Sequence, residues 1–155
     1  MKKKAWLLTW NPNRYAWDEV HGGFNDLINQ MSQVGHVFTT WSTGVNKSIK
    51  EGDRVYLIRL GKEPKGIVFS GIAVTNVFES PHWEEERAAR GDKSRHIYIM
   101  IDKMAKPEET LLPLSLLKEK FPDFKWSSQA SGIEIPDEID MELEKIWYEI
   151  KGYYL

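Results

Sequence analysis

Two β-branched, apolar runs joined by a tight turn constrain the fold of this chain more than any other feature. The runs are IKEGDRVYLIRLG and KGIVFSGIAVTNVFES, and the GKEPKG turn between them is rich in Gly, Pro and charge. Apolar runs separated by a turn of this composition predict a β-hairpin. The centre of the chain is therefore expected to belong to a β-sheet.

Further strands and helices are expected on both sides of this hairpin. Alternating or β-branched patterns predict strands at KAWLLTWNP, HVFTTW and RHIYIMIDKM. Apolar residues at helical spacing predict a helix before Gly35, with Gly35 as its C-terminal cap, and a last helix from residue 137 onward. LSLLKEKF could form a short helix, HWEEERAARGDKS a loop or short helix, and KWSSQASGIEIP a turn-rich loop.

The order strand, helix, several strands and closing helix predicts an α+β domain. We expect a strongly curved, mostly antiparallel sheet or a small β-barrel, flanked by helices. The chain of 155 residues has no repeat and no Gly-, Ser- or Pro-rich linker. We therefore expect one domain over residues 1–155, with residues 1–4 as a flexible basic tail.

Composition limits where the protein acts and what it binds. The chain has no cysteine, which excludes disulfides, thiolate metal sites and a cysteine nucleophile. The apolar run near the amino terminus is too short for a signal peptide or a membrane span, so we expect a soluble cytoplasmic protein. A formal charge of −2 means that a nucleic acid would have to meet a local cationic patch.

Seven tryptophans are the unusual part of the composition. Several lie beside Pro, Gly, Ser or Asn, where chains turn at the surface. Trp41 follows a β-branched run and precedes Ser42 and Gly44, so its ring could cap the core or form one wall of a pocket. Trp6 and Trp147 are expected in the core, whereas Trp10, Trp17 and Trp126 could be pocket wall or lid.

Five segments taken in order resemble a known family. WLLTWNP, TTWSTG, IKEGDRVYLIR with KGIVFSGIAV, SPHW and WSSQASGIEIP are similar to segments of EVE domains, which belong to the PUA-like superfamily and are relatives of YTH domains. The resemblance runs from Trp6 to about Trp147. Within this group the chain is most similar to EVE modules fused to HNH nucleases in modification-dependent restriction enzymes, although Trp41 and Trp83 lie closer together than the matching residues of YTH domains.

The resemblance implies a PUA-like EVE fold and a pocket that holds an extruded, modified base. It implies that Trp41 and Trp83 stack on the base, that Asn11 contacts the base edge, and that the loop with Ser128, Gln129 and Ser131 approaches the nucleic-acid backbone. Ser42 would add a polar group beside Trp41. The basic residues of the 87–95 segment are further candidates for phosphate contacts, and they are Arg87, Arg90, Lys93 and Arg95.

No catalytic, metal or cofactor motif stands out. The four histidines lack metal-ligand spacing, and no nucleotide-binding or serine-hydrolase motif is present. Asp53 followed by Glu63 and Lys65 superficially matches a nuclease core, but GKEPKG is better explained as a hairpin tip. Any nuclease activity is therefore expected in a separate domain or subunit, and we expect no cofactor.

Three functions remain open from the sequence. The first is a reader of double-stranded DNA carrying methylcytosine, hydroxymethylcytosine or N6-methyladenine, which would supply specificity to a fused or associated nuclease. The second is a PUA-like RNA- or nucleoside-binding protein or a small RNA-modifying enzyme. The third is an α+β domain in which every tryptophan is structural.

Overall fold

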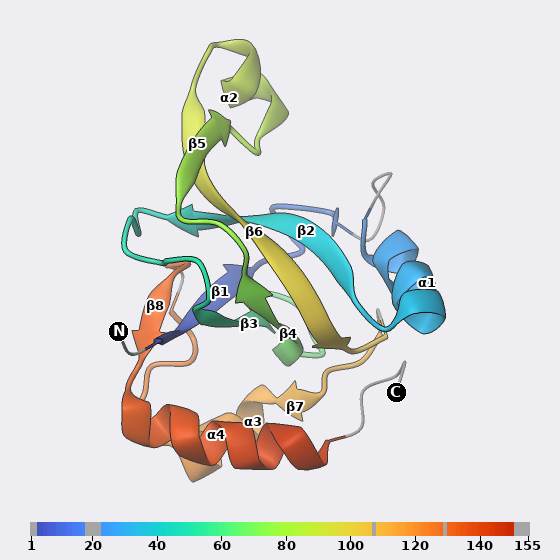
Figure 1. Ribbon diagram of the computed structural model, residues 1–155, viewed down its shortest axis with the longest axis vertical. Helices are drawn as coiled ribbons and strands as arrows, with labels where there is room; N and C mark the ends of the chain where they lie inside the picture. Colours follow the sequence, from blue (N-terminus) through green and yellow to red (C-terminus); the bar gives the residue numbers. More distant parts are fainter. Residues whose placement is uncertain (1–2, 18–22, 107, 129, 151–155) are drawn as a thin grey trace.

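One open β-sheet forms the centre of the protein (Figure 1). The computed structural model describes residues 3–17, 23–106, 108–128 and 130–150. Over these residues the elements are β1 (Ala5–Trp10), α1 (Phe24–Val34), β2 (Val37–Gly44), β3 (Arg54–Arg59), β4 (Gly66–Ala73), β5 (Phe78–Pro81), α2 (Glu85–Ala89), β6 (Lys93–Met104), β7 (Leu112–Pro113), α3 (Leu114–Lys120), β8 (Ile133–Ile135) and α4 (Asp137–Glu149). None of the helices described is long and apolar enough to cross a membrane.

The predicted hairpin is confirmed as β3 and β4, although β4 ends at Ala73 and the last residues of the second run belong to β5, which pairs with β6. The two strands pair antiparallel from Arg54 opposite Ile72 to Arg59 opposite Gly66. The predicted helix before Gly35 is α1, and Gly35 ends it in the left-handed conformation with φ 90°, donating its N–H to the Met31 carbonyl at 2.8 Å. The expected turn-rich loop at 125–136 also contains a strand that the sequence did not predict, β8.

The sheet follows the order β2-β6-β4-β3-β1-β8, with β5 added to β6 and β7 to β4. All described pairings are antiparallel except the one between β1 and β3. The α+β prediction with a mostly antiparallel sheet is therefore confirmed. The barrel alternative is not, because β2 and β8 end the sheet without pairing with each other in the part of the chain that the structure describes.

Both faces of the central strands are buried. Successive β1 side chains point to opposite faces, so Trp6, Leu8 and Trp10 join the core under α1, while Ala5 and Leu7 join the core under α3 and α4. This explains why β1 reads as a nearly continuous apolar run instead of an alternating one. As expected, Trp6 and Trp147 are core residues.

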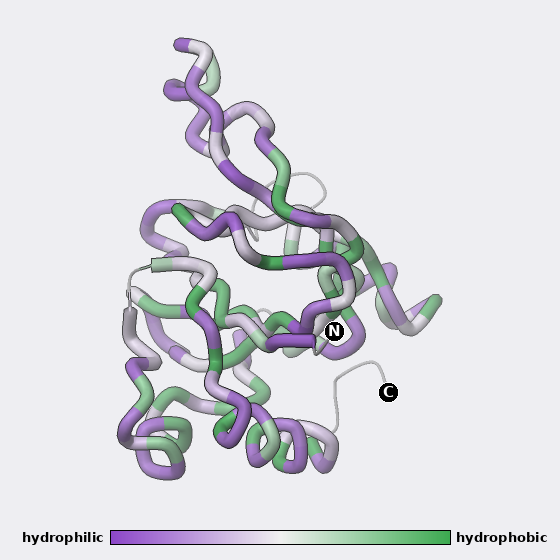
Figure 2. Tube along the Cα trace, turned by 60° about the vertical axis from the view of Figure 1, so that its left-hand side comes forward, coloured by the Kyte–Doolittle hydropathy of each residue, from purple (hydrophilic) through white to green (hydrophobic). Residues whose placement is uncertain are grey.

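A hairpin-like arm stands apart from the body of the protein. It consists of β5, α2 and the first part of β6, and it projects from the end of the sheet (Figure 1). Figure 2 shows the outer part of this arm in mostly hydrophilic colours, and α2 has no buried residue. The arm therefore adds an exposed, polar ridge to one end of the molecule.

A buried carboxylate joins the amino terminus to the start of the hairpin. Asp53 accepts hydrogen bonds from the Trp6 indole N–H at 2.9 Å, the Lys4 amide at 3.1 Å and the Lys50 amide at 3.0 Å. Lys3 also donates to the Glu51 carbonyl at 3.0 Å. The described part of the expected basic tail, Lys3 and Lys4, is thus bonded to the turn before β3.

We expect Asp53→Ala to be strongly destabilising. The change leaves three N–H groups without their acceptor, at about 1–3 kcal/mol for each group that stays buried and unpaired. Urea unfolding should show a loss of about 3 kcal/mol or more. Asp123→Ala, which removes an exposed carboxylate, is the control and should stay within about 0.5 kcal/mol of wild type. Equal losses in the two variants would contradict the role given to Asp53.

Candidate functional site

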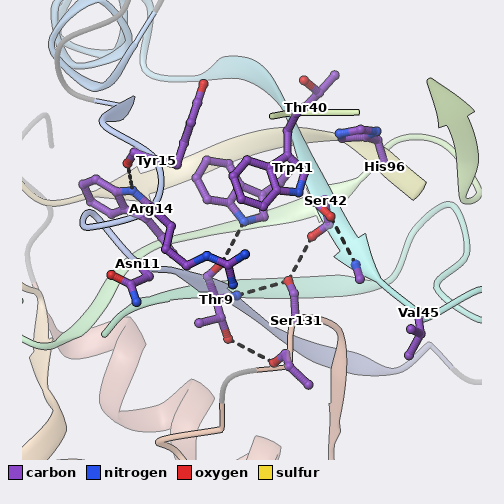
Figure 3. A pocket seen from close by; sticks show the side chains of 14 residues that line it. Thr9, Asn11, Arg14, Tyr15, Thr40, Trp41, Ser42, Val45, His96 and Ser131 are labelled. Atoms are coloured by element: carbon purple, nitrogen blue, oxygen red, sulfur yellow. Dashed lines mark hydrogen bonds between the residues drawn. The ribbon is translucent and has the colours of Figure 1, made fainter. Parts of the chain in front are cut away.

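A cavity of about 360 Å³ opens where β1 and β2 end beside each other. It brings together six of the residues that the sequence predicted for a nucleic-acid site, namely Trp10, Asn11, Trp41, Ser42, Trp83 and Ser131. Its other lining residues were not predicted, and they are Thr9, Arg14, Tyr15, Thr40, Gly44, Val45, His96 and Ala130. Figure 3 shows these side chains around the opening.

The cavity exists because the sheet does not close between β1 and β2. Strand β8 pairs with β1 only from Ala5 to Leu7, so the edge of β1 at Thr9 has no strand beside it. Gly132 ends the ladder: it has φ 82°, and a Cβ there would lie 2.8 Å from the Thr43 carbonyl oxygen. The chain joins the sheet only after this glycine, and the part of β1 beyond Leu7 faces a gap, which we call the seam.

Side-chain hydrogen bonds hold the two sides of the seam together (Figure 3). The Ser131 hydroxyl donates to the Ser42 carbonyl at 2.9 Å and accepts from the Thr9 amide at 3.2 Å. The Trp41 indole N–H donates to the Thr9 carbonyl at 3.1 Å. Ser131 therefore stands in for the strand partner that β1 lacks, and it fixes the floor of the cavity.

Trp41 forms one wall of the cavity and packs against core residues on its other side. Its ring packs edge-on against Trp17, with centroids 4.9 Å apart and an interplanar angle of 63°. Only 8% of Trp41 is exposed, so the cavity meets a limited part of the ring. Trp17 does not line the cavity; it supports Trp41 within the core under α1.

Tyr15 links the two predicted stacking tryptophans. Its ring lies 5.8 Å from Trp41 at 72° and 6.3 Å from Trp83 at 73°. Burial raises the pKa of Tyr15, so its phenol is neutral at physiological pH. Together with Trp10, these rings line one cavity, and Tyr15 is the one among them that the sequence did not indicate.

Trp83 comes from the arm, in the segment between β5 and α2. His82 stacks on it at 5.3 Å and 28°, and the His82 ring nitrogen Nδ1 accepts the Glu84 amide at 3.0 Å. Arg14 lies over Trp83, with 5.6 Å between the guanidinium carbon and the ring centroid. Trp83 is therefore positioned by neighbours from both the arm and the turn after β1.

His96 adds a polar group on the β6 side. It is 7% exposed, its Nδ1 lies 2.6 Å from the Ser80 hydroxyl, and its Nε2 lies 3.4 Å from the Ser94 hydroxyl. Burial lowers the pKa of His96, which favours the neutral ring at pH 7. A neutral imidazole carries one donor and one acceptor nitrogen, so both hydroxyl contacts can be satisfied without a charge.

Asn11 lies at the start of the turn that leaves β1. Its Oδ1 accepts the Asn13 amide at 2.9 Å, and its carbonyl accepts the amides of Arg14 and Tyr15 at 2.9 and 3.1 Å. The Asn11 side chain fits against Gly61, whose φ of 79° and lack of a Cβ permit the contact. The turn brings Arg14 and Tyr15 to the cavity.

Other predicted residues lie away from the cavity or outside the structure. Trp126 is 1% exposed in the core under α3 and α4, where its indole N–H donates to the Phe121 carbonyl at 3.2 Å. The residues around Trp126 in the sequence did not distinguish it from a tryptophan that lines a pocket. The Ser128 hydroxyl accepts the Ala130 amide at 3.2 Å and does not line the cavity. Gln129 lies outside the described residues.

The predicted phosphate contacts lie on the arm. Arg87 and Arg90 each pair with Asp92, at 3.1 and 3.4 Å. Lys93 and Arg95 lie on the first part of β6, opposite Pro81 and Glu79 of β5. None of the four lines the cavity, so any contact that they make would be with a ligand extending beyond it.

Asp53 and Glu63, which superficially match a nuclease core in the sequence, do not lie around one point. Asp53 precedes β3 and Glu63 follows it, so the two carboxylates lie at opposite ends of a strand. Both carboxylate oxygens of Asp53 moreover accept hydrogen bonds, from the Trp6 indole N–H and from two backbone amides. Among the described residues no group of three or more His, Asp or Glu side chains is arranged to hold a metal ion.

Comparison with solved structures identifies the fold. The DUF55 domain of human thymocyte nuclear protein 1 is 17% identical and has a TM-score of 0.56, with 95% of this chain and 99% of that chain covered. Human THYN1 protein, solved in complex with 5-methylcytosine containing DNA, is 16% identical with a TM-score of 0.57, covering 93% and 98%.

The chain has the same fold as these two structures. A hypothetical protein from Leishmania major is also similar, at 15% identity and a TM-score of 0.61, with 96% of each chain covered. No family model and no curated protein matches the sequence. At these identities the likeness concerns the fold alone, and it confirms the fold class that the sequence predicted.

Ser131→Ala should weaken the seam. It removes the donor to the Ser42 carbonyl and the acceptor of the Thr9 amide, which predicts a loss of about 1–2 kcal/mol in urea unfolding. The Thr9 amide should also exchange with solvent faster. Ser128→Ala is a matched control in the same loop because its hydroxyl makes a local contact only, and it should have the smaller effect on both readouts. An unchanged Thr9 exchange rate would rule out the bridging role of Ser131.

Proposed function

We propose that this protein reads a modified nucleobase in DNA by holding the extruded base in the seam cavity. The observation that carries the proposal is the convergence of Trp41, Tyr15 and Trp83 on one cavity that also exposes Asn11 and Ser42. Its volume of about 360 Å³ lies at the small end of ligand pockets, about 300–1,000 Å³. That size suits one base better than a large cofactor.

Stacking can offset the cost of extrusion. Taking a base out of a duplex costs a few kcal/mol. Each base–aromatic stack contributes about 1–3 kcal/mol, so two aromatic walls recover most of that cost. Trp83, held at the edge of the cavity by the arm, is the ring best placed to give a face to the base, because Trp41 is mostly buried.

A related fold supports the choice of ligand. Human THYN1 protein, which has the same fold, was solved in complex with 5-methylcytosine containing DNA. Modified cytosine in DNA is therefore the first ligand class to test, with N6-methyladenine next. A single methyl group adds only about 1–3 kcal/mol of preference in an apolar pocket. We expect moderate discrimination between modified and unmodified bases.

The arm would guide the nucleic acid that carries the base. It lies beside the cavity, since Trp83, between β5 and α2, and His96, on β6 opposite Phe78, both line the cavity. Lys93 and Arg95 on the arm are candidates for phosphate contacts. Arg87 and Arg90 both form ion pairs with Asp92, whose negative charge partly offsets theirs. The Ser128–Ser131 loop would approach the backbone from the other side of the opening.

The sequence resemblance extends the proposal to a biological role. The sequence resembles EVE modules that are fused to HNH nucleases, so we propose that the protein supplies modified-base specificity to a nuclease in a separate domain or subunit. Reading would then be separate from cleavage, and the cavity itself would carry out no reaction.

Trp83→Ala should remove most of the preference for the modified base. Loss of one stack predicts a drop of about ten- to a hundredfold in affinity for a duplex with one modified base. Fluorescence anisotropy should compare matched duplexes carrying cytosine, 5-methylcytosine, 5-hydroxymethylcytosine, adenine or N6-methyladenine. Tyr148→Ala, which removes an 87% exposed aromatic ring on α4, is the matched control and should leave binding unchanged.

The same panel separates the alternatives. Binding only to single-stranded RNA or to free nucleosides would favour an RNA- or nucleoside-binding protein. Equal affinity of the wild-type protein for modified and unmodified duplexes would refute the reader function. A Trp83→Ala protein that keeps its preference would show that Trp83 is not a stacking wall.

A further inference from the structure

Arg14 occupies the cavity in the structure. The turn after β1 carries it there, because the amides of Arg14 and Tyr15 both bond to the Asn11 carbonyl. Its guanidinium carbon lies 5.6 Å from the Trp83 ring centroid, and its Nη2 lies 3.8 Å from the Glu84 carboxylate. Figure 3 shows the guanidinium extending across the opening, in front of Thr9.

Arg14 takes a place that a flat ligand would need. A guanidinium is planar and stacks on aromatic faces as a base does. In this position the guanidinium lies over the ring of Trp83, and both residues line the cavity. A base stacking on Trp83 has to displace the Arg14 side chain first.

The contacts that hold Arg14 are weak enough to exchange. The Arg14 side chain is 64% exposed and that of Glu84 39% exposed, and exposed ion pairs contribute little to stability. At 3.8 Å the pair is also longer than a well-formed charged hydrogen bond. The Arg14 side chain thus contacts Trp83 through weak interactions only.

Charge determines where the displaced side chain goes. Among the described residues that line the cavity, Arg14 is the sole Lys or Arg, and none is acidic. An extruded nucleotide brings a phosphate to the mouth of the cavity along with its base. Arginine binds phosphate with paired, charge-assisted hydrogen bonds.

We propose that Arg14 is the phosphate-binding residue of the cavity and covers Trp83 until a base replaces it. This inference rests on the proposed function and adds to it the group that recognises the nucleotide's phosphate. It predicts opposite effects of one substitution. Removing the side chain uncovers Trp83 for a neutral nucleoside but takes away the partner of a phosphate.

The first test uses small ligands and the whole chain. NMR chemical-shift titrations should compare 5-methyl-2′-deoxycytidine, 5-hydroxymethyl-2′-deoxycytidine and N6-methyl-2′-deoxyadenosine with their 5′- and 3′-monophosphates. In Arg14→Ala we expect nucleoside affinity to rise by about two- to fivefold, because a nucleoside no longer has to break the exposed cation–π contact between Arg14 and Trp83. The advantage of a monophosphate over its nucleoside should disappear.

The second test uses duplex DNA with one modified base at several salt concentrations. Arg14→Ala should lower the slope of log affinity against log salt by about 1, because one phosphate contact is lost. Arg14→Lys keeps the charge without the planar group, so it should keep the slope. Lys145→Ala removes an exposed, Glu-paired cation on α4 and is the matched control, with no expected change.

Each outcome decides the inference. An unchanged monophosphate advantage or an unchanged salt slope in Arg14→Ala would overturn it. A loss of affinity for nucleosides and monophosphates alike would also overturn it, since Arg14 would then contact the base. If the wild-type protein prefers no modified ligand in either format, the proposed function fails and this inference falls with it.

Discussion

The site depends on a few side-chain hydrogen bonds that bridge two strands which do not pair. The Ser131 hydroxyl and the Trp41 indole both bond to the backbone of Thr9, and Ser131 also bonds to Ser42. Backbone groups at a sheet edge need partners when they are shielded from water. Because side chains supply these partners, the sheet can stay open there and leave a lined cavity without exposing unpaired groups.

Rigid support behind the cavity comes from the two-sided core. β1 sends Trp10 toward α1 and Leu7 toward α3 and α4, so the strand that carries Thr9 is packed from both faces. Trp17 and Phe24 extend this packing behind Trp41. The opposite side of the cavity is less constrained, since Trp83 comes from an arm with few buried residues. The cavity thus has one fixed wall and one wall on a projecting element, an arrangement suited to admitting a ligand.

Sequence patterns predicted the regular elements because burial imposes a period on them. The helix before Gly35 and the β3–β4 hairpin follow that rule, whereas β8 is too short to show a pattern. The residues that line the cavity were harder to predict from the sequence. Trp41 and Trp126 are both followed by serine, yet one lines the cavity and the other is sealed by Phe121 and Phe124. Arg14 and Tyr15 lie in an irregular turn, where neither spacing nor composition indicates which way a side chain points.

Gly132 has a consequence for how such a cavity could arise or vanish. Its left-handed backbone directly precedes β8, so the strand begins at Ile133, opposite Leu7, and the ladder does not reach Thr9. A chain in which this strand started earlier would pair it with Thr9, in the place where the Ser131 hydroxyl accepts the Thr9 amide now. One residue without a side chain thus keeps the edge of β1 open at the cavity.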